Sequence, residues 1–493
     1  MAEASEIMRG DAATAADQGA DPRVAQLVQS LGADIVLSGP AVLPYCRDWH
    51  GDVQSGAVAV LRPRDTAGVQ ACVRAAVALN LAIVPQGGNT GLVLGAIPDA
   101  PRSQVVLSLD RMTRIRDLDA DNYLAVVEAG VVLQSLRDAA AGAGLFFPLS
   151  LGAQGSCRIG GNVSTNAGGV NVLRYGMTRD LVLGLEVVLP DGQVFDGLSR
   201  LRKDNRGIDL KQLFIGAEGT LGIITAVSLK LLPAPEQVAT ALVALPRLED
   251  AITLYRRARR ECCDLMSAFE FMPPLAFKLA REAMPDLALP IEPSHPAYAL
   301  IEISGSGLVD IDDLMTRFLE GAFDSGLALD GVIAQSQAQA ASLWAVREGM
   351  NLGQAQRGRH YRSDVSVPLS RLADFVAEAE AAIAADMPGA ICVSYGHVGD
   401  GNVHLNVMPD YALGADRIDA QIAAAKKIVN RVLDRYDGSI SAEHGIGRLK
   451  RDDFEARLPA TRRDLLEAVR RAIDPGLVMN PGCQLTLAGG RQR

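Results

Sequence analysis

Three glycine-rich segments in the first half of the chain constrain its fold most strongly. They read PQGGNTG at residues 85–91, LGAQGSCRIGGNVSTNAGG at 151–169 and IGAEGTLG at 215–222. Glycine accepts positive φ angles and lets another backbone approach closely, so successive N–H groups in such loops can converge on a phosphate. One such loop is also an ordinary turn, but three in one half of the chain predict a pyrophosphate site.

The usual nucleotide-binding fingerprints are missing from these segments. No G-x-G-x-x-G follows a predicted strand, and G-x-x-x-x-G-K-[ST] does not occur in the chain, so neither a Rossmann site nor a P-loop is supported. The loops therefore predict a phosphate ligand held by another fold. A flavin dinucleotide is the option that also supplies chemistry.

Short apolar runs alternate with helical patterns from about residue 56 onward, which indicates an α/β or α+β fold. A chain of 493 residues is long enough for two or three domains. Paired prolines at 233 and 235 resist continuation of helix or sheet, so the first half is expected to end there.

The segment SYGHVGDGNVHLNV at 394–407 predicts a β-hairpin that carries two of the six histidines. An Asp-Gly pair between apolar runs favours a two-residue turn at 400–401. That turn would set His397 opposite His404, Tyr395 opposite Asn406 and Val398 opposite Val403, which places both imidazoles on one face. Two adjacent metal ligands or two neighbouring surface histidines would both fit this arrangement.

A second segment, SAEHGIG at 441–447, strengthens the metal interpretation because it places Glu443 beside His444 between small residues. Two imidazoles and one carboxylate form a common catalytic zinc set, in which a fourth position stays open. Manganese and iron(II) accept the same ligands, so the sequence does not choose the metal. A polar loop pair is the alternative for this segment taken alone.

Composition excludes several functions. A net charge of −10 and a pI near 5.2, without a dominant basic block, argue against a nucleic-acid partner. Seven cysteines without C-x-x-C spacing predict free thiols in a reducing compartment. A membrane span would require a run of about 18 apolar residues, and the sequence contains none. The first 22 residues lack the features of a signal peptide. A cytoplasmic location is therefore expected.

Seven motifs in order resemble the FAD-dependent D-2-hydroxyacid dehydrogenases of the vanillyl-alcohol oxidase superfamily. The resemblance covers roughly residues 40 to 485. The motifs are PQGGNTGL, GSCRIGGNVSTNAGG, RYG at 174, FIGAEGTLGIIT, GHVGDGNVHLN, SAEHGIGRLK and NPG at 480. The last four are most similar to those of members that oxidise D-2-hydroxyglutarate, although members acting on D-lactate or glycolate share much of the pattern.

The resemblance implies an α+β fold built from a two-part FAD-binding domain of the vanillyl-alcohol oxidase type, an α+β substrate domain and a small, mostly helical C-terminal segment. The expected divisions are a flexible tail at 1–22, the FAD-binding domain at 23–235, a substrate- and metal-binding domain at 236–430, and a C-terminal segment at 431–493 that completes the active site.

The resemblance also assigns roles to individual residues. The metal ligands are His397, His404 and Glu443, with zinc as the first choice, and His444 is the catalytic base. The FAD contacts are Pro85, Gln86, Gly87, Gly88, Asn89, Thr90, Gly91, Leu92, Gly152, Ser156, Gly160, Gly161, Asn162, Thr165, Asn166, Gly168, Glu218, Gly219, Gly222 and Ile223. The FAD is expected to be noncovalent, with Cys157 serving only in packing.

The implied reaction turns a 2-hydroxy acid into a 2-keto acid. His444 takes the hydroxyl proton with the help of the divalent ion, and the α-hydrogen passes as hydride to flavin N5. The expected substrate residues are Arg347, Asn351, Arg362 and Asn406, and a planar guanidinium suits a carboxylate well.

Three positions depart from the family pattern. The family usually has lysine at the position of Arg362, serine or threonine at that of Asn351, and a smaller or imidazole residue at that of Arg158. The charge kept at Arg362 favours a second substrate carboxylate and hence D-2-hydroxyglutarate.

Other interpretations stay open at this point. D-lactate or glycolate would keep the fold and change the substrate. A metal-dependent hydrolase of a phosphorylated substrate would use the same ligands without flavin, and a flavoprotein interaction subunit would need a partner to turn over. The external electron acceptor (an electron-transfer flavoprotein or a quinone), the metal and the oligomeric state, for which a homodimer is one option, also remain open.

Overall fold

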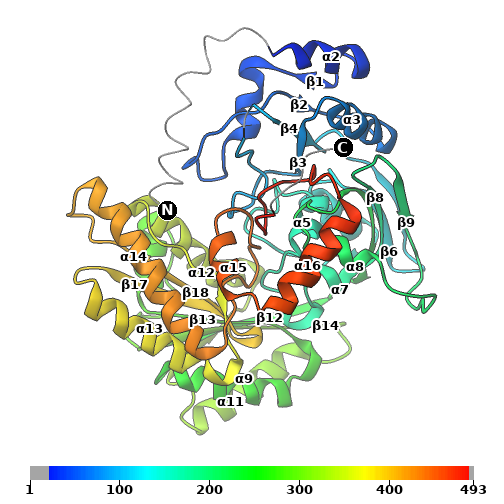
Figure 1. Cartoon of the computed structure of the whole chain (residues 1–493). Helices are drawn as coiled ribbons and strands as arrows, with labels where there is room; N and C mark the ends of the chain where they lie inside the picture. Colours follow the sequence, from blue (N-terminus) through cyan, green and yellow to red (C-terminus); the bar gives the residue numbers. More distant parts are fainter. Residues whose placement is uncertain (1–20, 101, 488–493) are drawn as a thin grey trace. The chain divides into compact units, whose positions relative to one another are not determined.

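The computed structural model describes residues 21–100 and 102–487, and the chain divides into two compact units. The first unit comprises Met1–Gly168, Met177–Pro233 and Glu443–Arg493, and the second comprises Gly169–Gly176 and Ala234–Ala442. Each of the two units mixes helices and sheets (Figure 1), so the α+β class expected from the sequence is confirmed.

The bounds of the two units differ from the expected divisions. A boundary at residue 430 would cut helix α14 (Ala415–Leu433), and the second unit instead ends at Ala442. The short helix α6 (Val172–Tyr175) belongs to the second unit because Arg174 Nη1 donates to the Ser304 carbonyl at 2.8 Å. At the N-terminus, Asp21 caps a helix that begins at Pro22, while the rest of the expected tail lies outside the described residues.

Two main sheets form the first unit, which agrees with the two-part FAD-binding domain. The four-stranded sheet has the order β1-β2-β4-β3, with parallel pairing of β2, β4 and β3. The five-stranded sheet has the order β5-β6-β10-β8-β9 and is antiparallel throughout. The strands are β1 (Val36–Leu37), β2 (Val60–Leu61), β3 (Ala82–Gln86), β4 (Gln104–Ser108), β5 (Ile115–Asp119), β6 (Leu124–Glu128), β8 (Val182–Val188), β9 (Val194–Gly197) and β10 (Ile223–Lys230), and a small pair joins β7 (Leu145–Phe146) to β11 (Leu232–Pro233).

Helix α3 (Thr66–Ala78) of the first unit buries one apolar face. Its buried residues Val69, Val73 and Ala76 recur at helical spacing, and the Asp65 carboxylate caps the helix by accepting from the Gly68 N–H at 2.7 Å. The other helical segments are α2 (Pro22–Leu31), η1 (Gly39–Cys46), α4 (Leu133–Gly142), α5 (Ile159–Thr165), α7 (Thr178–Leu181), α8 (Lys211–Phe214), α15 (Arg451–Arg457) and α16 (Ala460–Ile473).

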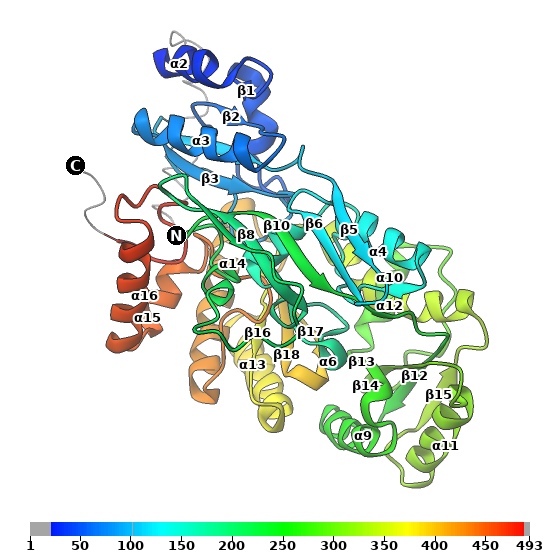
Figure 2. The same ribbon diagram turned by 90° about the vertical axis from the view of Figure 1, so that its right-hand side faces the viewer.

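A seven-stranded antiparallel sheet forms the second unit, in the order β15-β12-β14-β13-β17-β18-β16. Helices α9 and α11 lie on one face, and α10 and α12 lie on the other (Figure 2). The strands are β12 (Gln237–Leu245), β13 (Met266–Met272), β14 (Ala297–Gly305), β15 (Asp330–Ile333), β16 (Val365–Ser366), β17 (Ile391–His397) and β18 (Asn402–Met408). The helices are α9 (Leu248–Glu261), η2 (Cys263–Leu265), α10 (Leu275–Ala283), α11 (Ile311–Asp324), α12 (Gln337–Arg357), η3 (Leu369–Arg371), α13 (Leu372–Asp386), η4 (Val398–Asp400) and η5 (Asp434–Tyr436).

The predicted hairpin exists as β17 and β18, but its register was wrong by two residues. His397 pairs with Asn402 and Tyr395 pairs with His404, because the connection is a four-residue turn that contains η4 and a left-handed Gly401. Side chains alternate between faces along a strand, so a shift of two residues keeps His397 and His404 on the same face. Their ring centroids are 5.6 Å apart.

Two further findings concern the whole described chain. None of its helices combines the length and the apolar character that a membrane span requires. All seven cysteines are free thiols.

Candidate active site

The first two glycine loops of the first unit pack backbone against backbone. A Cβ atom on Gly88 would lie 2.3 Å from the Ser156 carbonyl oxygen, and one on Gly87 would lie 3.3 Å from the Gly161 nitrogen. Only glycine allows such an approach, which explains why these two segments of the sequence are rich in it.

We therefore expect Gly88→Ala to destabilise the protein by about 1–3 kcal/mol, since the added methyl group meets a carbonyl that cannot rotate away. Gly142→Ala is the matched control, because Gly142 lies at the end of α4 outside the three glycine loops and a Cβ atom there meets no atom within 4 Å. Thermal unfolding and the flavin content after dialysis provide the measurements. Equal stability and flavin retention in the two variants would contradict the close packing of the loops.

The third loop joins the first two. Glu218 donates its N–H to the Ser164 carbonyl at 2.8 Å, and Gly216 donates to the Val163 carbonyl at 3.1 Å. A Cβ atom on Gly219 would lie 3.0 Å from the ring of Pro85. Three segments that are distant in the sequence thus form one set of loops in the first unit.

This set of loops fits a dinucleotide. In the described part of the chain, no backbone N–H from Gly87 to Leu92 donates to a protein acceptor. Cβ atoms on Gly91, Gly152 and Gly161 would meet nothing within 4 Å, and the buried Oδ1 of Asn162 has no hydrogen-bond partner. Backbone N–H donors without a protein acceptor, beside open space, are what an anionic pyrophosphate requires.

Several predicted FAD residues use their side chains to hold these loops. Gln86 donates to the carbonyls of Tyr45 and Ala96, and Asn89 donates to that of Arg47 at 2.8 Å. Asn166 adopts a left-handed conformation that ends α5, and its Oδ1 accepts from the Arg179 N–H at 2.8 Å. Thr165 donates within α5. These side chains shape the loops.

The remaining predicted FAD positions lie at the contacts between loops and sheet. Gly160 donates its N–H to the Ala129 carbonyl, Gly222 packs against Val187, and Ile223 begins β10.

Cys157 and Arg158 have roles within the first unit. Burial raises the pKa of the Cys157 thiol, which makes it a poor nucleophile and agrees with a role in packing. Arg158 Nη1 donates to the carbonyls of Asp110 and Gly130. The departure from the family pattern at Arg158 is therefore accommodated by backbone oxygens.

Within the first unit, Glu218 binds the segment that carries Glu443 and His444 through hydrogen bonds. The buried Glu218 carboxylate accepts from the N–H groups of Ile446 at 2.8 Å and Gly447 at 2.7 Å, and from the Gln484 side chain at 3.0 Å. Its predicted FAD contact stays a prediction, and the carboxylate itself binds the loop that follows His444.

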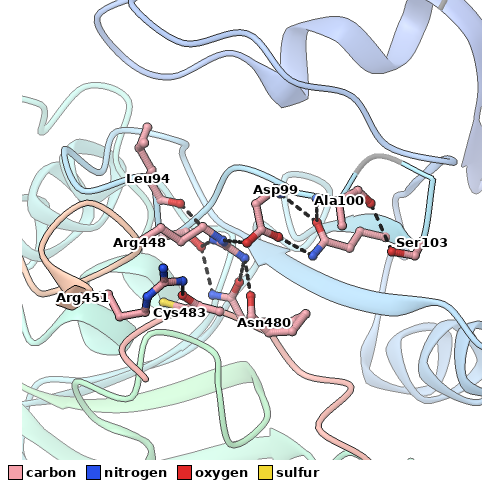
Figure 3. Close-up of polar contacts among 12 residues, drawn as sticks. Leu94, Asp99, Ala100, Ser103, Arg448, Arg451, Asn480 and Cys483 are labelled. Carbon is pink, nitrogen blue, oxygen red and sulfur yellow. Dashed lines mark hydrogen bonds and ion pairs between the residues drawn. The ribbon is translucent and has the colours of Figure 1, made fainter. Parts of the chain in front are cut away.

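Arg448 continues this attachment (Figure 3). Its Nη1 donates to the Leu94 carbonyl at 2.9 Å, its Nη2 donates to Asn480 Oδ1 at 2.8 Å, and its Nε lies 3.2 Å from an Asp99 oxygen. Asn480 in turn donates to the Glu218 carbonyl at 2.7 Å. The C-terminal segment is therefore an integral part of the first unit.

Glu443 and His444 are half-buried. The Glu443 carboxylate lies over Gly168, where a Cβ atom would approach its Oε1 to 2.7 Å. The predicted base and one predicted metal ligand therefore belong to the same unit as the glycine loops.

In the second unit, one face of the sheet gathers the two predicted histidine ligands. Glu270 on β13 pairs directly with His397 on β17, and Tyr395 pairs with His404 on β18. The Glu270 carboxylate is hydrogen-bonded to His397 Nδ1, and the Tyr395 and His404 rings lie 5.0 Å apart. Side chains two residues apart on a strand lie on the same face, so Asn406 lies on this face together with His404.

Arg347 reaches this face from α12. It is buried, its Nε donates to Glu270 Oε2 at 2.9 Å, and its guanidinium carbon lies 4.6 Å from the centroid of the Tyr395 ring. Burial alone would raise the pKa of the Glu270 carboxyl, but His397 and Arg347 beside it lower that pKa. Glu270 is therefore an ionised carboxylate shared between a predicted metal ligand and a predicted substrate residue.

The amide of Asn406 is engaged by the chain. Its Nδ2 donates to Gln354 Oε1 at 3.0 Å and to the Tyr395 hydroxyl at 3.2 Å, and its Oδ1 accepts from the Ser363 N–H at 3.1 Å. The Tyr395 hydroxyl donates to Asn351 Oδ1 at 2.5 Å. Asn406 and Asn351 thus hold the ring on which Arg347 stacks.

Arg362 differs from Arg347. Its side chain is half-buried and forms no ion pair or hydrogen bond with any residue that the structure describes.

Sequence reasoning missed Glu270 and Tyr395. The signal for Glu270 was a carboxylate in the middle of MSAFEFM, a strand that is buried throughout. Lys, Glu, Arg and Asp are almost never fully buried unless they are paired, so a lone Glu in such a strand predicts buried cationic partners.

Comparison with known proteins agrees with this description. The chain matches the FAD binding domain model over residues 57–197 and the model of FAD linked oxidases, C-terminal domain, over residues 234–483. It is 41% identical over 447 residues to the mitochondrial D-2-hydroxyglutarate dehydrogenase of Bos taurus, covering 90% of this chain and 80% of that one. It is 38% identical over 466 residues to the D-2-hydroxyglutarate dehydrogenase of Xanthomonas citri pv. viticola, covering 94% and 96%.

Solved structures share the fold at low sequence identity. The structure of p-cresol methylhydroxylase with substrate bound has a TM-score of 0.74 at 18% identity, covering 95% of this chain and 97% of that one. Alkyldihydroxyacetonephosphate synthase has a TM-score of 0.71 at 17% identity, covering 94% and 85%. The protein is thus an FAD-dependent oxidoreductase, and it belongs to the D-2-hydroxyacid dehydrogenases of the vanillyl-alcohol oxidase superfamily.

Proposed function

We propose that the protein oxidises D-2-hydroxyglutarate to the corresponding 2-keto acid, using FAD and a divalent metal. The observation that carries the proposal is the cluster on the second unit's sheet, where Arg347 and His397 share the Glu270 carboxylate. A 2-hydroxy acid carries its carboxylate and its hydroxyl on adjacent carbons, so it needs a cation and metal ligands close together. Similarity to proteins named D-2-hydroxyglutarate dehydrogenases supports this substrate.

Two arginines are proposed to anchor the dicarboxylate. Arg347, fixed on the Tyr395 ring, binds the carboxylate next to the hydroxyl. Arg362 binds the second carboxylate, because it is a half-buried cation without an ion pair among the described residues. D-lactate and glycolate lack that second group, so Arg362 distinguishes the proposed substrate from these alternatives.

His397, His404 and Glu443 are the proposed metal ligands, with zinc as the first choice. The donor set fits, because two imidazoles lie on one face and Glu270 holds His397 through Nδ1, which leaves Nε2 as the ligand atom. A divalent ion bound by these residues would lower the pKa of the substrate hydroxyl.

The chain's own part in the chemistry is to orient the substrate and to move a proton. An imidazole nitrogen of His444 takes the proton of the substrate hydroxyl. FAD held by the glycine loops would supply the acceptor for the α-hydrogen, as hydride, and for the two electrons of the oxidation. The residues at 85–92, 152–168 and 218–223 are the proposed FAD contacts.

Reoxidation of the reduced flavin requires an external electron acceptor, for which we keep an electron-transfer flavoprotein or a quinone. A homodimer and a cytoplasmic location stay predictions from the sequence.

The test is an anaerobic visible spectrum of the purified protein before and after the addition of D-2-hydroxyglutarate, D-lactate or glycolate. We expect a yellow protein that D-2-hydroxyglutarate bleaches most efficiently, and we expect treatment with a chelator to abolish the bleaching. Arg362→Ala should raise the concentration of D-2-hydroxyglutarate needed for half-maximal reduction at least about tenfold, the loss expected for a charged hydrogen bond, and should leave that of D-lactate unchanged.

Other outcomes would change the assignment. Bleaching that is most efficient with D-lactate would change the assigned substrate to D-lactate and leave the assigned reaction unchanged. A yellow protein that no 2-hydroxy acid bleaches would favour a subunit that needs a partner. A colourless protein would favour the metal-dependent hydrolase, against which the match to an FAD binding domain already speaks.

A further inference from the structure

We infer that Glu270 is a positioning residue that aligns His397 and Arg347 for the reaction; this inference rests on the proposed function. Glu270 lies in the middle of β13 and is fully buried. One of its oxygens contacts His397 Nδ1 and the other accepts from Arg347 Nε at 2.9 Å. No role had been assigned to it from the sequence.

Burial of a carboxylate is costly, so its two partners must compensate for the lost hydration. Glu270 meets this need through a direct strand pairing with His397 and through Arg347 on the helix that crosses the same face. The two contacts use opposite oxygens of one rigid group. A shift of this carboxylate would therefore move both partners together.

For His397 the contact selects the tautomer. An ionised carboxylate only accepts hydrogen bonds, so Nδ1 carries a hydrogen, and in the neutral imidazole that can bind a metal Nε2 then carries the lone pair. A metal ligand of this kind is oriented and made more basic by its carboxylate partner. Glu270 thus determines which nitrogen of His397 is the ligand.

For Arg347 the contact fixes the plane of the guanidinium. Nε is bound to Glu270, and the Tyr395 ring lies against the guanidinium at 4.6 Å. A hydrogen bond at Nε and an aromatic ring against the guanidinium carbon together leave the group little rotational freedom. The spacing between a metal on His397 and a carboxylate on Arg347 is therefore set by Glu270, and reactions of this kind tolerate little misplacement.

The experiment compares Glu270→Gln with Glu302→Gln in the flavin-loaded protein. Glu302 lies on the same face of the same sheet, on β14, where it binds Trp344 and Ser267 and does not contact His397 or Arg347. We expect Glu270→Gln to weaken zinc binding, measured by competition with a chelator, about 10- to 100-fold. It should also raise KM for D-2-hydroxyglutarate, whereas Glu302→Gln should change neither quantity.

A second measurement needs no variant at Glu270. In the chelator-treated wild-type protein, at a pH high enough for the imidazole to be neutral, nitrogen-15 NMR should show His397 as the Nδ1-protonated tautomer, with the signal identified by its loss in His397→Gln. The Nε2-protonated tautomer, or wild-type zinc affinity and KM in a folded Glu270→Gln protein, would overturn the inference. If Glu270→Gln does not fold, the tautomer decides the question.

Failure of the proposed function gives a different pattern. A wild-type protein that binds no divalent ion, or that no 2-hydroxy acid reduces, would refute the proposed function whatever the tautomer of His397. A wild-type protein that binds zinc and is reduced, beside an equally active Glu270→Gln, would refute the positioning role alone.

Discussion

Replacing His444 with alanine is expected to slow reduction of the bound flavin by D-2-hydroxyglutarate about 10²- to 10⁴-fold, the usual contribution of a positioned general base. An α-hydroxyl is a very weak acid at neutral pH, so the reaction needs a group that takes its proton. His444 is half-buried in a loop whose next residues are fastened by Glu218. Anaerobic stopped-flow measurement of flavin bleaching at saturating substrate gives the rate.

The flavin spectrum and the zinc content of His444→Ala should match those of the wild type, because the glycine loops and both proposed histidine ligands are unchanged. His295→Ala is the control, since that imidazole lies in the loop before β14, against the ring of Tyr298, and has no role in the proposed reaction. A wild-type rate in His444→Ala would remove His444 from the proposed chemistry. A variant without flavin would instead indicate a structural role.

Local patterns in the sequence predicted the parts of the site that depend on backbone chemistry. The loops around Gly88 and Gly161 could be recognised because close backbone packing requires glycine, and the structure shows that packing. The prediction that His397 and His404 share a face was correct because side chains alternate along a strand, so a shift in register by an even number of residues leaves each side chain on its face. The register itself was wrong, because a four-residue turn and a two-residue turn use the same Asp-Gly signal.

The parts that the sequence could not predict depend on contacts between distant segments. Glu270 and His397 are 127 residues apart and meet only because β13 pairs with β17. Likewise, α6 joins the second unit through the contact of Arg174 with Ser304, 130 positions away. No local pattern in the sequence indicates that contact. Asn406 was predicted on the correct face, but only the structure shows that its amide is hydrogen-bonded to Gln354, Ser363 and Tyr395.

Glu218→Gly is expected to destabilise the protein by roughly 3 kcal/mol, although glycine would relieve backbone strain at that position. Glu218 has a φ of 51°, a left-handed conformation that costs a non-glycine residue roughly 1–2 kcal/mol. Against this gain stands the loss of a buried carboxylate that accepts from two backbone N–H groups, each such bond contributing about 1.5–3 kcal/mol. The sign of the net effect therefore tests the role of the carboxylate.

Asn80→Gly is the matched control, because Asn80 also has a positive φ, 54°, but is exposed. It should be neutral or slightly stabilising, whereas Glu218→Gly should lower the midpoint of thermal unfolding by about 3 °C. Stabilisation by Glu218→Gly would mean that its carboxylate does not hold the loop. If the loss occurs, flavin reduction should slow as well, because His444 lies two and three residues from the N–H groups that Glu218 binds. The residue that holds the C-terminal segment in place thus also holds the base.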